Sequence, residues 1–231
     1  MTISISPLID LSISALCFFC AWKLYGAYKK DTANKVIEYF FKAYVMAVVA
    51  YLFFSLPRII MPDQSFYLGV GFIIAQLFLF IATAYLAMVT TFFIDPLRYK
   101  ISFWLFMILA IVVIILFIIY FGMPVYDKKT GITDWHIDPI AGIASSVLFL
   151  TVLLPSTIYF FSRGVCSHNK IVRVRSLLIS IGFILLMIAT YTFYQASSET
   201  QVFVSDLFSL SSFLVIFLGV YYKRGTSLKE K

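Results

Sequence analysis

Residues Phe66 to Ile94 read FYLGVGFIIAQLFLFIATAYLAMVTTFFI, a stretch without a single charged side chain. An α-helix of roughly 20 apolar residues crosses the hydrocarbon core of a bilayer, so this stretch is long enough to span a membrane. A surface helix of a soluble protein would show a polar face at helical spacing, and this stretch shows none. Three more uncharged stretches cover Ile101 to Val125, Pro139 to Ser162 and Ser176 to Ser198.

The rest of the chain adds three apolar stretches that contain charges, Leu8 to Ala27, Glu38 to Ile60 and Val202 to Tyr222. In all, 62% of the residues are hydrophobic and 13% are charged, whereas soluble domains carry about 25% charged residues. We predict one all-α domain over residues 1–231, a seven-transmembrane-helix bundle. Its approximate spans are 8–27, 38–60, 67–93, 101–122, 139–161, 176–194 and 202–222. The first span is the weakest of the seven predictions, and six spans are the alternative.

Basic residues gather in alternate connections between the spans. With the N-terminus outside, all but three of the 18 Lys and Arg residues lie on the cytoplasmic side, the exceptions being Arg58, Lys128 and Lys129. The positive-inside bias therefore predicts an external N-terminus and a cytoplasmic C-terminus in a multi-pass protein of the cell membrane. The net charge of +7 is expected to face anionic lipid headgroups, and we expect no nucleic-acid partner. The N-terminus lacks a basic region and a cleavage site, so no signal peptide is expected.

The connection from Phe121 to Asp138 has a β-strand pattern. Two β-prone stretches flank Asp127 to Gly131, and a glycine can take the positive φ of a hairpin turn. We predict a short outer β-hairpin between the fourth and fifth spans. It is either a lid over an outer pocket or a stiff ordered loop. Asp138 before Pro139 predicts a helix cap followed by proline in the first turn.

Three charged residues inside the predicted spans lie at a similar depth near the outer side: Asp10, Arg58 and Asp206. Span seven can close back onto spans one and two, and a charge left unpaired in the membrane is costly. We predict that Arg58 pairs with Asp206, with Asp10 within reach as a second acceptor. The cluster either fixes helix packing or forms a pair for which a ligand or proton competes.

Uncharged polar residues also lie within the spans. Gln76 lies midway along span three, and Tyr191 and Tyr194 lie in the outer part of span six. Their neighbours are Thr190 and Gln195 on span six and Ser205, Ser209, Ser211 and Ser212 on span seven. They predict a small, outward-facing polar pocket. The alternative is that each makes hydrogen bonds between helices.

Patterns of enzymatic chemistry are weak in this sequence. Cys17 and Cys20 form a C-x-x-C on one helix face, but a thiol relay would need a second pair. His136 and His168 lie in loops, where they cannot ligate a haem inside the bundle. Cys166 and His168 alone do not define a zinc site. We expect a non-enzymatic protein without cofactor or metal.

Two features together resemble a known family. One is seven spans with an external N-terminus and short connections. The other is the hairpin-like outer loop, Tyr126 to His136, followed by Asp138, Pro139 and a new span. This arrangement resembles the seven-transmembrane sensor region of some bacterial histidine kinases, and the resemblance covers nearly the whole chain. In that family the spans precede cytoplasmic signalling domains, which these residues do not include. The resemblance therefore implies a sensor that acts through a separate protein, or a sensor that has lost its effector.

We accordingly expect an integral membrane sensor or receptor-like module. It would bind a small or lipophilic ligand or a membrane partner, and signal through a separate protein on the cytoplasmic side or in the membrane. Two alternatives stay open. One is a small-solute transporter or channel, similar in length and topology to seven-span sugar transporters but without their Pro-Gln dipeptide. The other is an accessory subunit of a membrane complex.

Overall fold

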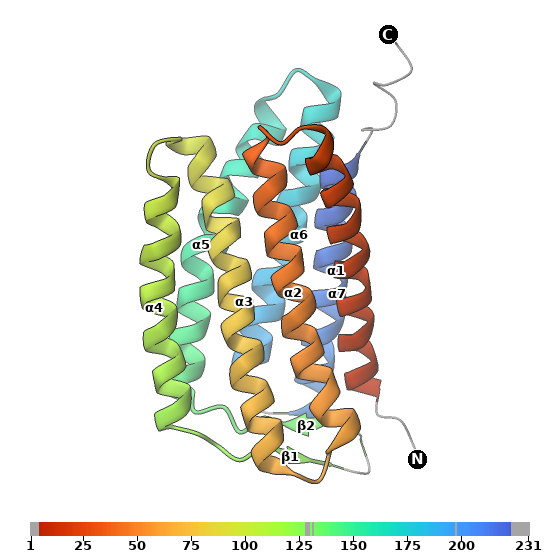
Figure 1. The fold of residues 1–231 in the computed structure, drawn as a ribbon, viewed down its shortest axis with the longest axis vertical. Coiled ribbons are helices and arrows are strands. Elements are labelled where there is room, and N and C mark those ends of the chain that lie inside the picture. Colours follow the sequence, from red (N-terminus) through yellow and green to blue (C-terminus); the bar gives the residue numbers. More distant parts are fainter. Residues whose placement is uncertain (1–4, 128–129, 131, 197, 223–231) are drawn as a thin grey trace.

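The computed structural model describes residues 5–127, 130, 132–196 and 198–222. In this part of the chain, seven long helices form an upright bundle (Figure 1). They are α1 (Ile5–Lys30), α2 (Lys35–Ile60), α3 (Ser65–Ile94), α4 (Tyr99–Ile119), α5 (Pro139–Cys166), α6 (Lys170–Tyr194) and α7 (Glu199–Tyr221). Each helix is long and apolar enough to cross a membrane. The prediction of seven long apolar helices is confirmed, and this architecture fits a multi-pass membrane protein.

Several helices extend beyond the apolar stretches from which they were predicted. Helix α1 begins at Ile5 instead of Leu8, and α6 begins at Lys170 instead of Ser176. Polar residues still form helix where a side chain caps the first turn. The side chain of Asn169 accepts the backbone N–H of Ile171 at 2.9 Å. Asp138 caps α5 in the same way, with Pro139 in the first turn, which confirms that prediction.

Six of the helices form a closed ring. Along the chain α1 packs on α2, α2 on α3, α5 on α6 and α6 on α7, and α7 returns to α1. Helix α3 also contacts α5 directly, so α4 lies outside the ring against α3 and α5 (Figure 1). The buried residues of α4 are Phe106, Ala110, Val113 and Phe117, and many of its other large apolar side chains are exposed. Such an outer surface suits a lipid bilayer.

The two ends of the bundle differ, and we call them the hairpin end and the basic end. The hairpin end carries the start of α1 and an antiparallel strand pair, β1 (Val125–Tyr126) and β2 (Thr133–Asp134) (Figure 1). Part of the predicted turn, Lys128, Lys129 and Gly131, lies outside the described residues. The basic end carries the α1–α2, α3–α4 and α5–α6 connections. The basic residues that follow Tyr222, which were predicted to lie on the cytoplasmic side, are also outside the described residues.

Gly142 permits a close approach between α5 and the end of α6. A Cβ at this position would lie 2.7 Å from the backbone oxygen of Tyr194. A backbone atom cannot move aside as a flexible side chain can, so a small residue is required here.

We expect Gly142→Ala to lower the free energy of unfolding by about 1–3 kcal/mol, because the added methyl group overpacks the helix contact. Gly26→Ala is the matched control, since nothing lies within 4 Å of a Cβ at Gly26. There alanine should stabilise helix α1 by roughly 0.5–1 kcal/mol. Titration with a denaturing detergent in mixed micelles measures both changes. Equal effects at the two glycines would contradict the close contact at Gly142.

Candidate functional site

Four buried side chains at the hairpin end form a polar chain that we call the arginine cluster: Ser6, Asp10, Arg58 and Asp206. Arg58, in the last turn of α2, is 3% exposed and forms an ion pair with Asp10 on α1. Its Nη1 donates to Ser6 Oγ at 3.0 Å, and its Nε donates to the backbone oxygen of Phe54 at 2.7 Å. Ser6 Oγ in turn donates to Asp206 Oδ2 at 2.7 Å. The cluster therefore joins α1, α2 and α7 inside the bundle.

The pairing within the cluster differs from the predicted one. The three charged residues do meet, but Asp10 forms the ion pair with Arg58, and Asp206 reaches Arg58 through Ser6. The ion pair in the structure is thus Arg58 with Asp10, which was predicted as the second acceptor, while Asp206 takes the second place. The reason is that helix α1 begins at Ile5, which places Ser6 one turn before Asp10 on the same face. The four-residue spacing from Ser6 to Asp10 is the sequence signal that Ser6 shares a helix face with Asp10 and can contact the same arginine.

A cavity leads from the arginine cluster into the middle of the bundle. About 80 Å³ of it is open to the centres of water-sized molecules, whereas roughly 10–15 Å³ measured this way holds one water. The ring helices and the hairpin connection line it, and α4 does not. Its other walls are mostly apolar or aromatic, including Phe40, Tyr44, Tyr51, Phe54, Leu79, Leu86, Phe149, Phe193, Phe213 and Ile216. Apolar walls with a few polar groups are typical of ligand sites.

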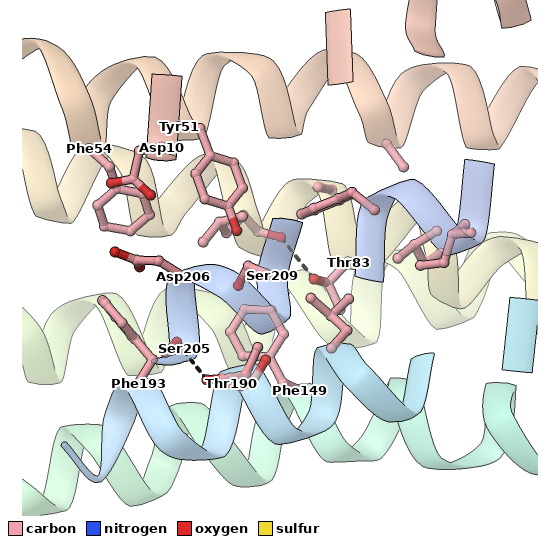
Figure 2. Close-up of a pocket in the computed structure, with 18 of the residues that line it drawn as sticks. Asp10, Tyr51, Phe54, Thr83, Phe149, Thr190, Phe193, Ser205, Asp206 and Ser209 are labelled. Atoms are coloured by element: carbon pink, nitrogen blue, oxygen red, sulfur yellow. Dashed lines mark hydrogen bonds between the residues drawn. The ribbon is translucent and has the colours of Figure 1, made fainter. Parts of the chain in front are cut away.

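Hydroxyl groups line the cavity beyond the cluster (Figure 2). Ser205 on α7 donates to the backbone oxygen of Ala189 at 2.9 Å and so joins α7 to α6. Thr83 donates to a carbonyl of its own helix, also at 2.9 Å. Tyr51 and Ser209 line the same space from α2 and α7. These oxygens give the middle of the cavity a few hydrogen-bonding positions between apolar walls.

Trp135 closes the cavity at the hairpin end. It directly follows strand β2, is 7% exposed, and packs against the rings of Phe54 and Phe72. The central carbon of the Arg58 guanidinium lies 5.2 Å from the centre of the Trp135 ring, a cation–π contact. The connection between α4 and α5 thus places an aromatic side chain directly over the arginine cluster.

A tight backbone turn follows Trp135. Asp134 Oδ1 accepts the backbone N–H of His136 at 2.9 Å, as in an Asx turn. His136 has a φ of 46°, in the left-handed region that few residues other than glycine adopt. A Cβ at Gly122 would lie 2.3 Å from the backbone oxygen of His136, so a glycine is required there. Strained backbone of this kind concentrates at functional sites.

Of the three uncharged residues that were predicted to share a pocket, Gln76, Tyr191 and Tyr194, one lines the cavity. Tyr194 is buried, lines the cavity, and donates its hydroxyl to Oε1 of Gln76, which is fully buried behind it. Tyr191 is 63% exposed and lies outside the cavity lining, so its assignment to the pocket is wrong. The reason is helical geometry. Tyr191 follows the cavity residue Thr190 by one position, which turns its side chain by about 100° toward the lipid-facing side.

A second pocket lies at the basic end, with about 330 Å³ open to water-sized molecules. Arg163, Arg175 and Ser176 are among its lining residues, and Arg175 donates to the backbone oxygen of Val220 at 2.8 Å. Phe40 lines both this pocket and the central cavity. Its side chain therefore forms part of the wall between the two spaces.

The cysteines of the C-x-x-C pattern lie in the core of the bundle. Cys17 and Cys20 are both 0% exposed, and neither forms a disulfide. Cys166, at the end of α5, is exposed at the basic end. This difference in exposure makes Cys166 the natural site for chemical labelling.

The chain was also compared with known proteins. No family model matches it, and neither a curated protein nor a solved structure matches it. Support for a function therefore comes mainly from the geometry of the cavity.

Proposed function

We propose that this protein is a sensor or receptor-like module of the cell membrane whose central cavity binds a small, partly lipophilic ligand. The hairpin end faces the outside and the basic end faces the cytoplasm, in accord with the positive-inside bias. The observation that carries the proposal is the cavity itself, with mostly apolar walls, a charged end and Trp135 over that end. The resemblance to seven-transmembrane sensor regions of histidine kinases is a second support.

Helix α7 connects the cavity to the basic end, so a ligand bound in the cavity can change the structure at the basic end. Asp206 belongs to the arginine cluster at one end of α7, and Arg175 on α6 binds the carbonyls of Gly219 and Val220 at the other end. A ligand that binds one helix arrangement more tightly than another shifts the population toward it. Because α7 joins the cavity to the basic end, such a shift would reach a cytoplasmic partner.

The orientation predicts which side of the membrane exposes Cys166. A membrane-impermeant thiol reagent should label Cys166 only from the cytoplasmic side, while the buried Cys17 and Cys20 stay unlabelled. In a Cys166→Ala background, Thr130→Cys in the exposed hairpin connection should react only from outside. Labelling of right-side-out and inverted vesicles measures this. Reaction with the two sides exchanged would contradict the orientation.

A reporter on Cys166 tests the receptor proposal. An environment-sensitive fluorophore is attached to Cys166 in liposomes, and 1-octanol is titrated as a small lipophilic probe. We expect a saturable change of emission, because occupation of the cavity shifts α6 and α7. Ala189→Phe is the control, since Ala189 lines the cavity and a larger side chain fills it. A response that rises linearly with octanol, or that survives Ala189→Phe, would contradict the proposal.

One observation favours the transporter alternative. The central cavity and the pocket at the basic end share Phe40, so a movement of one side chain would bring the two spaces closer to a continuous path. A transporter would take up a labelled hexose into liposomes over time, and Phe40→Ala would raise the rate. A sensor would show no uptake in either form. The same liposomes serve both experiments.

A further inference from the structure

We propose that the central cavity takes an amphiphilic amine, a ligand that joins one positively charged nitrogen to an apolar chain, and that Asp206 binds the nitrogen. This inference rests on the proposed function and names the chemical class of its ligand. It starts from the charges of the cavity lining.

Among the described residues that line the cavity, the charged ones are two aspartates, Asp10 and Asp206, and one arginine, Arg58. In this part of the chain the lining therefore carries one negative charge in excess. A buried charge without a partner costs several kcal/mol, and the cost falls when an opposite charge lies beside it. Arg58 forms a direct ion pair with Asp10, whereas it reaches Asp206 through the hydroxyl of Ser6 and at longer range. Asp206 is therefore the less fully compensated of the two carboxylates.

Asp206 has a carboxylate oxygen available to a ligand. The residue is 7% exposed and lines the cavity, and its Oδ2 accepts the hydroxyl of Ser6. The hydrogen bond from Ser6 engages Oδ2 and not Oδ1. Figure 2 shows the carboxylate between Asp10 and Phe193 at one end of the cavity. A positively charged nitrogen there would gain a charged hydrogen bond and the faces of nearby aromatic rings, Phe54 and Phe193.

The remainder of the cavity fits an apolar chain. Asp206, Ser209, Phe213 and Ile216 all line it, and their spacing of three or four residues places them on one face of α7. This face changes from charged to apolar along the helix, from the hairpin end toward the middle of the bundle. Across the cavity Leu79 and Leu86 of α3 add apolar surface. A ligand would thus lie with its nitrogen under Trp135 and its chain directed inward.

Trp135 itself provides the signal for a binding experiment. Trp22→Phe and Trp104→Phe leave Trp135 as the single tryptophan of the chain, since there are three. The protein is placed in phosphatidylcholine nanodiscs near neutral pH and titrated with octylamine, 1-octanol and octanoate, which share a chain and differ in charge. We expect a saturable change of Trp135 emission with octylamine, at concentrations about tenfold or more below those of octanol. Octanoate should give no saturable change.

Asp206→Asn tests the role of the carboxylate. The amide keeps the size of the side chain and an acceptor for Ser6, and the variant loses the excess charge, so we expect a melting temperature at least equal to that of the parent. Its octylamine affinity should fall to that of octanol, while its octanol affinity stays unchanged. Asp63→Asn is the control for surface attraction, because Asp63 is an exposed carboxylate at the same end. It should leave the octylamine affinity unchanged.

The outcomes separate this inference from the proposed function. If octanol and octylamine bind equally, and Asp206→Asn changes neither, then a proton alone neutralises Asp206 and the amine proposal is overturned. The cavity would still be a site for lipophilic ligands. If none of the three compounds gives saturable binding, both the amine proposal and the proposed function fail.

Discussion

Arg58→Ala is expected to lower the free energy of unfolding by about 3–5 kcal/mol, the cost of leaving a buried charge without its partner. Arg58 contacts α1 through Asp10 and Ser6, so its loss strands Asp10 in the membrane interior and detaches α1 from α2 at the hairpin end. Detergent-induced unfolding in mixed micelles measures the change. If Arg58→Ala fails to fold, Arg58→Lys is the substitute, because it keeps the charge and loses part of the hydrogen bonding. Its free energy of unfolding should lie between that of the parent and that expected for Arg58→Ala.

Arg98→Ala is the matched control for Arg58→Ala. Arg98 also forms an ion pair, with Asp95 at 3.5 Å, but its side chain is 78% exposed. Exposed pairs contribute about 0–1 kcal/mol, so this substitution should change little. Double-mutant cycles then resolve the pairing, and the coupling of Arg58 to Asp10 should exceed its coupling to Asp206. A larger coupling to Asp206 would contradict the structure of the cluster.

Trp135→Ala is expected to cost about 3 kcal/mol or more, as for other buried aromatic residues that are truncated. The substitution removes the contacts to Phe54 and Phe72 and the cation–π contact to Arg58. It also opens the hairpin end of the cavity to water. The same unfolding assay measures the loss.

Trp104→Ala provides the comparison, because Trp104 on α4 is 67% exposed and faces outward from the ring. Substitutions at such positions usually change stability by less than about 0.5 kcal/mol. Similar losses at Trp135 and Trp104 would show that the hairpin connection does not close the bundle.

The helices of this protein could be predicted because their signal is local. A stretch such as Phe66 to Ile94 is apolar over its whole length, and capping residues such as Asp138 mark an end regardless of the neighbouring helices. The same apolar composition gives no information on which face of a helix points inward, because a helix that is apolar on all sides has no polar face from which its orientation can be predicted. Tyr191 and Tyr194 could therefore not be told apart as lipid-facing and cavity-lining residues.

The arginine cluster was predictable in its charged members and not in its connections. The sequence places Asp10, Arg58 and Asp206 at the same depth in the membrane, because depth depends only on the direction of each span and on the position of the residue along it. Which aspartate pairs with the arginine depends on helix rotation and on Ser6, which lies before the apolar stretch of α1. Trp135 escaped prediction for a related reason. Its position over the cluster depends on the left-handed backbone of His136 and on the close approach of Gly122, which the residue types alone do not reveal.

The accessibility of a cysteine at Ser209 tests most directly whether the cavity is a ligand site that opens toward the hairpin end. Ser209 lines the middle of the cavity, and the native cysteines Cys17, Cys20 and Cys166 are first replaced. A small, membrane-impermeant cationic thiol reagent is then applied to each side of sealed vesicles. We predict modification of Ser209→Cys from the hairpin side only, faster when Trp135 is also replaced by alanine and slower when octylamine is present. Equal modification from both sides, or a rate that neither Trp135→Ala nor octylamine changes, would contradict the assignment.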